Sequence, residues 1–156
     1  MTYPRQAVQD AFALLPKNMD TLAARVIHAA IGYQESKYLT RRQYGNGPAA
    51  GYWQFERGGI KGVMLHKASA RLAMEVCDAR GVEFNSEEIW KAFQVDDVLA
   101  AAFARLLMWT DAKPLPALGD QQAAWHLYAD KARTWSPGKP HPEDWPASYK
   151  FGMGVV

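Results

Sequence analysis

Residues 20–36 read DTLAARVIHAAIGYQES, and after Leu22 their apolar residues recur at intervals of three and four positions. This spacing is typical of a helix that buries one face. Asp20 or Thr21 is a suitable N-cap, because a short polar side chain can accept a hydrogen bond from a free backbone N–H group of the first turn. We therefore predict a helix that begins near residue 22, with a helical pattern that fails after Leu39.

Glu35 lies near the end of this predicted helix, at the edge of its apolar face. A carboxyl group that is held against apolar groups resists ionisation. General acid catalysis near neutral pH needs such a protonated carboxyl group. The alternative is a solvated surface glutamate that pairs with a cation such as Arg41 or Arg42, and for a glutamate taken alone this alternative is the commoner one.

A glycine-rich segment follows the predicted helix, since residues 40–62 contain six glycines and Pro48. Glycine loses more conformational freedom on folding than any other residue, so this density predicts that no stable helix forms here. The aromatic run Tyr-Trp-Gln-Phe at residues 52–55 is expected to form a short strand of a small sheet, or part of an irregular loop.

The rest of the chain is also predicted to be helical. The expected elements are a short helix over 5–15 that stops at Pro16, a helix over 70–77 that ends near Gly81, a segment capped by Ser86, a long buried central helix over 95–106, and a last helix over 121–131. Four prolines between residues 135 and 149 predict a tail without regular structure. The expected fold class is mainly α, in one domain over residues 1–156, because 156 residues are too few for two comfortable domains.

The composition is that of a globular domain, with 49% hydrophobic and 22% charged residues. A net charge of +2 suits an anionic polymer but is far too small to indicate nucleic acid as a partner. Cys77 is the only cysteine, so no disulfide forms within the chain, and we expect its thiol to be buried. No segment approaches the roughly 20 apolar residues that span a bilayer, so no membrane insertion is expected.

Neither a metal nor a cofactor is expected. The histidines are far apart and have no metal-ligand spacing, and we expect His28 to lie on the flank of its helix; the four are His28, His66, His126 and His141. The glycine pairs lack the lysine and the serine or threonine that follow the glycines of a phosphate-binding loop.

The segment AAIGYQESKYLTRRQYGNGPAAGYWQFERGG, residues 29–59, resembles the catalytic core of the lysozyme-like superfamily. The resemblance is closest to soluble lytic transglycosylases and phage muralytic domains, and it covers roughly residues 20–60. In that family a helix ends in a Gln-Glu-Ser triplet whose glutamate is the acid, and a Gly-Leu-Met-Gln element lines the cleft. The corresponding residues here are Gln34-Glu35-Ser36 and Gly51-Tyr52-Trp53-Gln54.

The resemblance implies an α+β lysozyme-like domain, in which a small glycine-rich sheet or loop region forms one side of a cleft. It implies Glu35 as the catalytic acid, Ser36 as its supporting neighbour and Gln54 as a hydrogen-bonding group on the substrate side. The family also has an Ala-Tyr-Asn-Ala-Gly segment that faces the acid. Residues 124–128 read AWHLY here and lack its asparagine and glycine, so either Trp125 or Tyr128 takes the aromatic role.

Aromatic side chains could stack on the flat C–H faces of sugar rings. The candidates are Tyr44, Tyr52, Trp53, Trp125 and Trp135, whereas Trp90 and Trp109 are assigned to packing. Most aromatic residues of a small helical domain belong to its core, which is the alternative for each candidate.

Glu56 is a possible second carboxylate. It follows Gln54 by two positions, so on a strand the two side chains would share a face. The alternative is a surface glutamate beside Arg57, and Asp96 and Asp97 are expected at solvated helix positions. If Glu56 faces the cleft, water can attack and the enzyme is a hydrolase. If Glu56 points away, the resemblance implies that Glu35 acts first as acid and then as base, and that a 1,6-anhydro sugar forms.

The expected function is cleavage of the β-1,4 MurNAc-GlcNAc glycan strand of bacterial peptidoglycan by a phage-encoded, monomeric enzyme. The N-terminus has no signal-peptide pattern. We therefore expect it in the virion, or in the host cytoplasm with release by a holin, where other virion or lysis proteins are possible partners. The alternatives are a non-catalytic virion protein that keeps a lysozyme-like fold and binds cell-wall glycan, and an unrelated helical adaptor. The aromatic residues of the glycine-rich loop favour the enzyme and the glycan-binding virion protein over the adaptor, because an adaptor needs no groups that stack on sugars.

Overall fold

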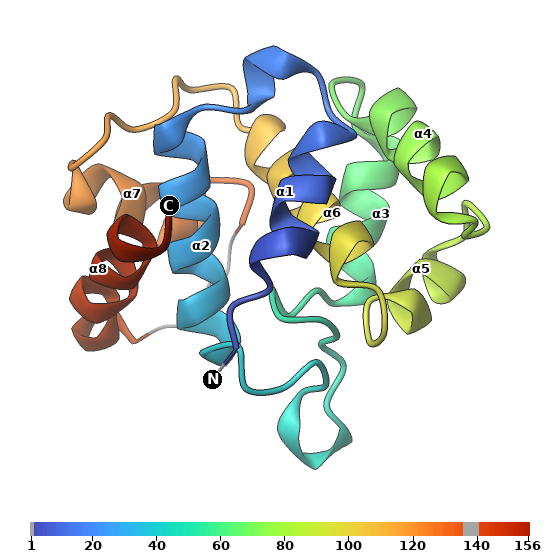
Figure 1. Cartoon of the computed structure of the whole chain (residues 1–156), viewed down its shortest axis with the longest axis horizontal. Coiled ribbons are helices and arrows are strands. Elements are labelled where there is room, and N and C mark those ends of the chain that lie inside the picture. Colours follow the sequence, from blue (N-terminus) through green and yellow to red (C-terminus); the bar gives the residue numbers. More distant parts are fainter. Residues whose placement is uncertain (1, 136–140) are drawn as a thin grey trace.

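The computed structural model describes residues 2–135 and 141–156, and this part of the chain is mainly helical (Figure 1). The α-helices are α1 (Arg5–Ala13), α2 (Leu22–Ser36), α3 (Arg57–Leu65), α4 (Ala70–Arg80), α5 (Ser86–Ala92), α6 (Asp97–Trp109), α7 (Gln121–Ala129) and α8 (Trp145–Val155). Short 3-10 turns lie at Lys17–Met19, Tyr44–Asn46 and Pro142–Asp144. The predicted mainly α class is confirmed.

Helix α6 is the central element that the apolar stripe predicted. Residues 98–108 are all buried, and α1, α3 and α4 pack against α6. Its N-terminus is closed by Asp96, whose side chain accepts a hydrogen bond from the backbone N–H of Leu99. Asp96 also pairs with Arg80, and Asp97 pairs with Arg41, so both acidic residues connect α6 to its neighbours rather than being only solvated.

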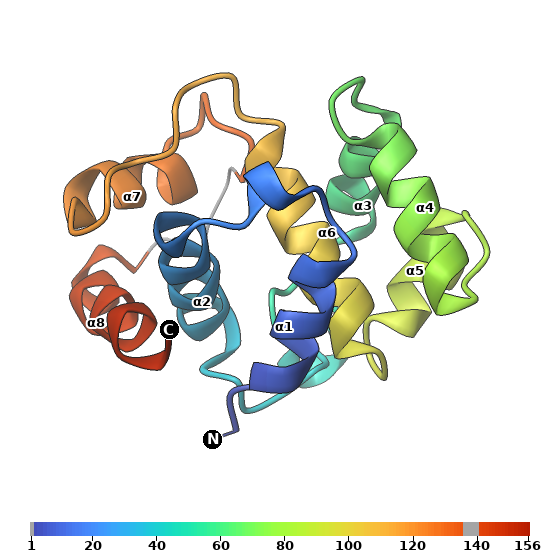
Figure 2. The ribbon, with the colours of Figure 1, turned by 45° about the horizontal axis from the view of Figure 1, so that its top comes forward.

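Helix α2 lies between α6 and a second group of helices formed by α7 and α8 (Figures 1 and 2). Of the two N-cap residues that the sequence offered, Asp20 and Thr21, the cap is Thr21. Its side chain accepts a hydrogen bond from the backbone N–H of Ala24. The helix ends at Lys37, which adopts the left-handed conformation. Helix α8 packs along α2 and also contacts α7.

The prediction that no helix forms within residues 40–62 is wrong, because α3 begins at Arg57 and contains three of the six glycines. Ile60 and Val63 are fully buried on its inner face. Each glycine lowers helix stability by about 1 kcal/mol relative to alanine. Burial of an apolar face outweighs that effect, because tertiary packing supplies most of the stability of a protein helix.

Of the two alternatives for residues 52–55, a short strand or an irregular loop, the structure has the loop: the described residues contain only isolated bridges, from Ala50 to Arg42 and to Phe55. A tight turn forms there, in which the backbone N–H of Gln54 donates to the carbonyl of Gly51 at 3.0 Å. Gly51 and Gln54 both have positive φ values, 78° and 53°. A turn with two left-handed residues cannot be an extended strand.

Two further predictions are corrected. The tail is not irregular throughout, because α8 begins at Trp145 and carries Pro146 in its first turn, where the missing N–H of proline has no helical acceptor to lose. Asn85, not Ser86, caps α5 and accepts hydrogen bonds from the N–H groups of Glu87 and Glu88. Residues 136–140 of the predicted tail lie outside the described residues. Among the described helices, none is long and apolar enough to cross a membrane.

Candidate active site

The side chains of Glu35, near the end of α2, and Tyr128, near the end of α7, contact each other although they are 93 residues apart in sequence. The hydroxyl group of Tyr128 donates a hydrogen bond to the carboxylate oxygen Oε2 of Glu35. The Tyr128 side chain is completely buried, whereas Glu35 is partly exposed. Of the two aromatic residues that the resemblance left open, Tyr128 is the one that contacts Glu35.

Tyr128 belongs to a cluster of aromatic rings that joins α7 to α8. Its ring is stacked on that of Trp145, with 5.4 Å between centroids and an interplanar angle of 6°. Trp125 lies next to both, with its centroid 5.8 Å from Tyr128 and 5.6 Å from Trp145, and it is only partly buried. Trp135 is buried, with its ring centroid 6.5 Å from that of Tyr128. The cluster therefore leaves Trp125 as the partly exposed ring beside the Glu35–Tyr128 pair.

Gln34, the first residue of the triplet, is buried and connects α2 to the C-terminal segment. Its Oε1 accepts a hydrogen bond from the Ser148 hydroxyl at 2.6 Å, and its Nε2 donates to the carbonyl of His141 at 3.0 Å. Sequence reasoning did not assign this role. The partners lie more than 100 residues away, and no local pattern marks such a pair.

Ser36, the residue after Glu35, closes the end of α2. Its hydroxyl donates to the carbonyl of Gly32 at 3.2 Å and accepts from the N–H of Tyr38 at 3.0 Å. Lys37 and Tyr38 both have positive φ values, 52° and 54°, which side chains other than glycine seldom adopt. Such strain is concentrated at functional sites, where the surrounding structure holds it in place.

The predicted substrate-side residues of the second motif are mostly turned into the protein. Trp53 is 1% exposed and donates through its indole N–H to the carbonyl of His28. Tyr52 is also buried and lies under the guanidinium group of Arg41. The amide of Gln54 is partly buried and donates to the carbonyl of Gly51 at 2.8 Å. These contacts brace the turn beside α2, and the buried rings do not offer a face to a ligand.

Glu56 is exposed, immediately before the first residue of α3. The expected shared face with Gln54 required a strand, and the chain forms a turn there instead. Among the other aromatic candidates, Tyr44 is 78% exposed on the glycine-rich loop. Trp90, assigned to packing, is buried between neighbouring side chains and donates to the carbonyl of Pro48.

His28 does not lie on a helix flank, as the spacing suggested, but in the core between the rings of Phe12 and Trp53. Its Nε2 is 2.9 Å from the carbonyl oxygen of Ala101, while its Nδ1 is buried without a hydrogen-bond partner. Burial lowers the pKa of His28 to about 3, since a charged imidazolium would lose its hydration there. The ring is therefore neutral at physiological pH.

Among the described residues, one group of side chains has potential ligand atoms close enough for a metal ion. These atoms of His141, Glu143 and Asp144 lie within 4.8 Å of one another, and all three residues are exposed. Exposed acidic groups are common without an ion, and His141 Nδ1 lies 3.4 Å from a carboxylate oxygen of Glu143. The absence of a metal and of a cofactor stays a prediction.

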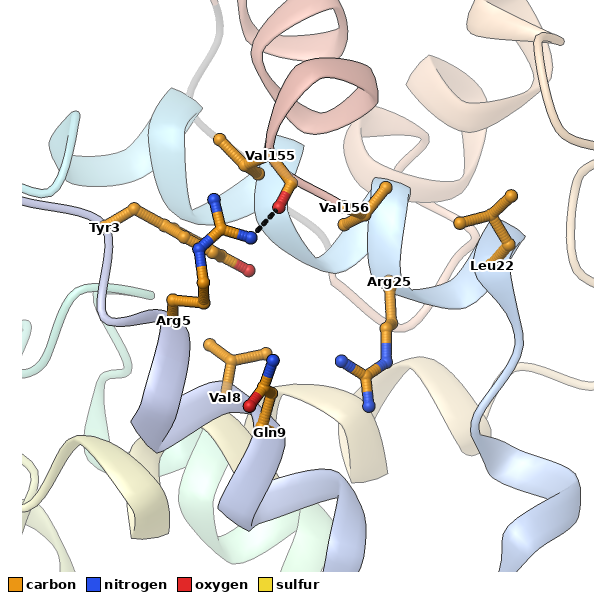
Figure 3. A pocket seen from close by; sticks show the side chains of 8 residues that line it. All are labelled: Tyr3, Arg5, Val8, Gln9, Leu22, Arg25, Val155 and Val156. Atoms are coloured by element: carbon orange, nitrogen blue, oxygen red, sulfur yellow. Dashed lines mark hydrogen bonds between the residues drawn. The ribbon is translucent and has the colours of Figure 1, made fainter.

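A pocket of about 200 Å³ lies at the opposite end of α2 (Figure 3). It is lined by Tyr3, Arg5, Val8, Gln9, Leu22, Arg25, Val155 and Val156. Arg25 is ten residues before Glu35, so the pocket is about 15 Å away along the helix axis at 1.5 Å per residue. Inside it the Arg5 guanidinium donates to the carbonyl of Val155. The pocket is thus separate from the candidate site, and a cleft beside Glu35 stays a prediction.

No protein-family model, no curated protein and no solved structure matches this chain.

Proposed function

We propose that this protein cleaves the glycan strand of bacterial peptidoglycan, with Glu35 as the general acid. The observation that carries the proposal is the hydrogen bond from the Tyr128 hydroxyl to the Glu35 carboxylate. The two residues come from separate segments, the Gln-Glu-Ser triplet and residues 124–128. In the family that the sequence resembles, these are the acid and the segment that faces it. A chance triplet on an adaptor would have no reason to be joined to that second segment.

The geometry around Glu35 suits a group that first gives a proton and then carries negative charge. The acid is partly exposed, so a substrate oxygen can reach it, while its partner Tyr128 is fully buried and held by the Trp145 ring. A hydroxyl group held in this way restricts the rotation of the carboxyl group. A proton donor that is fixed within hydrogen-bond reach of its acceptor contributes about 100-fold to 10,000-fold to a rate.

In the proposed reaction the protonated Glu35 gives its proton to the glycosidic oxygen, and the bond from this oxygen to C1 of MurNAc breaks. The Glu35 carboxylate then takes the proton of the 6-hydroxyl of the same MurNAc residue, whose oxygen bonds to C1. The products are a 1,6-anhydro-MurNAc end and a free 4-hydroxyl on GlcNAc. Glu35 ends protonated, as it began. Tyr128 donates a hydrogen bond to the carboxylate between the two steps, when the negative charge needs it most.

We propose this transglycosylase route rather than hydrolysis because of the position of Glu56. Hydrolysis with retention or inversion needs a second carboxylate across the scissile bond. The candidate for it, Glu56, lies exposed before α3, and the strand that would have aligned it with Gln54 is replaced by a turn. A reaction in which Glu35 is both acid and base does not need Glu56.

Trp125 is the proposed sugar-stacking residue. Its ring is partly exposed and adjacent to Tyr128, whereas the rings of Tyr52 and Trp53 are buried. An aromatic ring beside the acid can pack on the C–H face of a sugar and orient the glycosidic bond. We further propose that the enzyme is phage-encoded and acts as a monomer during entry or lysis.

The experiment that tests the proposal compares the wild-type protein with Glu35→Gln on purified sacculi. The amide keeps the shape of the side chain but has no acidic proton to give. We expect the wild-type protein to lower the turbidity of the suspension and Glu35→Gln to leave it unchanged over the same time. Equal clearing by the two proteins would overturn the proposal.

A further inference from the structure

The C-terminal helix α8 contacts both helices that carry the Glu35–Tyr128 pair, although neither residue belongs to it. Both views of the ribbon place α8 beside α2, with α7 next to α8 (Figures 1 and 2). Helix α2 carries Glu35 and α7 carries Tyr128. A single element therefore lies against the two helices whose side chains must meet.

The contact of α8 with α7 is made by Trp145. Its ring is 2% exposed and lies flat on the ring of Tyr128. Its indole N–H donates to the backbone carbonyl of Gln121 at 3.0 Å, at the first residue of α7. Trp145 thus contacts α7 near both of its ends and fixes the position of the Tyr128 ring relative to α8.

The contact of α8 with α2 is made by Ser148 and Gly152. The Ser148 hydroxyl donates to Gln34, the neighbour of Glu35. At Gly152 the two backbones approach so closely that a Cβ atom would lie 2.3 Å from the carbonyl oxygen of Val26. These contacts hold α8 against α2 at two places, one near the middle of α2 and one near its C-terminal end.

We infer that Trp145 is a positioning residue, which holds the Tyr128 hydroxyl at the Glu35 carboxylate through its stacked ring. The inference rests on the proposed function for its effect on rate, but the coupling of Trp145 to Glu35 is a property of the folded protein alone. A displacement of about 1 Å at a catalytic group can lower a rate about 100-fold. The C-terminal helix α8 therefore helps to position the residues of the candidate site.

The test uses Trp145→Leu, which removes the stacked ring and the indole N–H, and Trp145→Phe, which keeps an aromatic ring. Phe93→Leu is the matched control, because Phe93 is also buried but its ring packs on Phe55 and Phe103, which belong to neither α7 nor α8. We expect kcat on sacculi to fall about 10-fold to 100-fold in Trp145→Leu with little change in KM, to recover largely in Trp145→Phe, and to stay near wild type in Phe93→Leu.

A second readout does not depend on activity. The carboxyl ¹³C signal of Glu35 is followed against pH in the wild-type protein, Tyr128→Phe, Trp145→Leu and Phe93→Leu. We expect the titration of Glu35 in Trp145→Leu to move in the same direction as in Tyr128→Phe, and to stay unchanged in Phe93→Leu. An unchanged titration in folded Trp145→Leu overturns the inference, and so does an equal change in Phe93→Leu.

If Trp145→Leu does not fold, Trp145→Phe takes its place in the titration, because it keeps an aromatic ring and removes the indole N–H that donates to Gln121. It is expected to move the Glu35 signal in the same direction but by less, and no movement overturns the inference. An inactive wild-type protein, or an active Glu35→Gln, would contradict the proposed glycan cleavage. The NMR titration would still test the role of Trp145, because it does not depend on activity.

Discussion

Gly152 of α8 lies so close to Val26 of α2 that a Cβ atom built on it would be 2.3 Å from the Val26 carbonyl oxygen and 3.2 Å from the backbone nitrogen of Ala30. The atoms in the way belong to the backbone of a buried helix, which cannot move aside as a side chain can. The contact brings α8 against the helix that carries Glu35. It makes the stability of the domain sensitive to one methyl group.

Gly152→Ala is expected to destabilise the protein by about 1–3 kcal/mol, because overpacking of a tight interface forces the backbone to shift. Gly154→Ala is the control on the same helix, since nothing lies within 4 Å of its Cβ position. There alanine should be neutral or stabilising by up to about 1 kcal/mol through its helix propensity. Urea unfolding of the two variants measures both effects, and an equal loss in both would contradict the close approach of α8.

Tyr128→Phe removes the hydroxyl group that contacts Glu35 and keeps the ring that packs on Trp145. We expect kcat to fall about 10-fold or more with KM nearly unchanged, because the lost contact acts on the acid and not on the substrate. A loss of about 1 kcal/mol in unfolding free energy should accompany it. Steady-state rates on soluble muropeptide chains check the first expectation, and a kcat equal to that of the wild type would show that the hydroxyl plays no part.

The sequence predicted the scaffold of this site better than its contacts. The start of α2 at Asp20 or Thr21 and the apolar stripe of α6 were predictable because capping and periodicity are local. The end of α2 at Ser36 was less so, since the helical pattern runs on to Leu39. The glycines of α3 and the prolines before α8 misled the prediction, because burial of Ile60 and Val63 and the first-turn position of Pro146 are tertiary or positional effects. The pairing of Gln34 with Ser148 left no signal, since each residue is ordinary on its own helix.

His28 makes stability depend on pH. Its pKa is lowered to about 3 by burial in the folded state, against an ordinary value of 6.5 when the chain is unfolded. Between these values the unfolded chain binds a proton that the folded protein does not, so stability is fully present above pH 6.5 and is lost as the pH falls. The loss approaches about 1.4 kcal/mol per pH unit well inside this window.

The comparison of His28→Gln with the wild-type protein between pH 6.5 and 4.5 isolates the contribution of His28, and the Arg25 side chain lowers the pKa of Asp20 away from this window. Urea unfolding at several pH values should give a smaller slope in His28→Gln than in the wild-type protein. His66→Gln, at an exposed position, should keep the wild-type slope. A wild-type stability that does not change over this window would contradict the neutral, buried state of His28.

Trp125→Ala is expected to weaken substrate binding by about 1 kcal/mol, which corresponds to a fivefold increase in KM, with a smaller effect on kcat. Trp109→Ala is the control, because Trp109 is also partly buried but lies at the end of α6. Co-sedimentation of both variants with sacculi, in a Glu35→Gln background, measures binding without turnover. Equal binding by the two variants would show that Trp125 is not part of the substrate-binding site.

Glu56→Gln is expected to leave the rate and the products unchanged, because the side chain is exposed before α3 and has no part in the proposed reaction. Mass spectrometry of the released muropeptides separates the two kinds of chemistry. A loss of activity in this variant, together with products that carry a reducing end, would favour a hydrolase with two carboxylates.

The most direct test of the central claim is mass spectrometry of sacculi treated with the wild-type protein and with Glu35→Gln at equal concentration. Circular dichroism should first confirm that both proteins are folded. The account predicts 1,6-anhydro muropeptides from the wild-type protein and a yield at least 1,000-fold lower from Glu35→Gln, in line with the loss of a general acid. Equal yields from the two proteins, or no glycan cleavage by the folded wild-type protein, would contradict it.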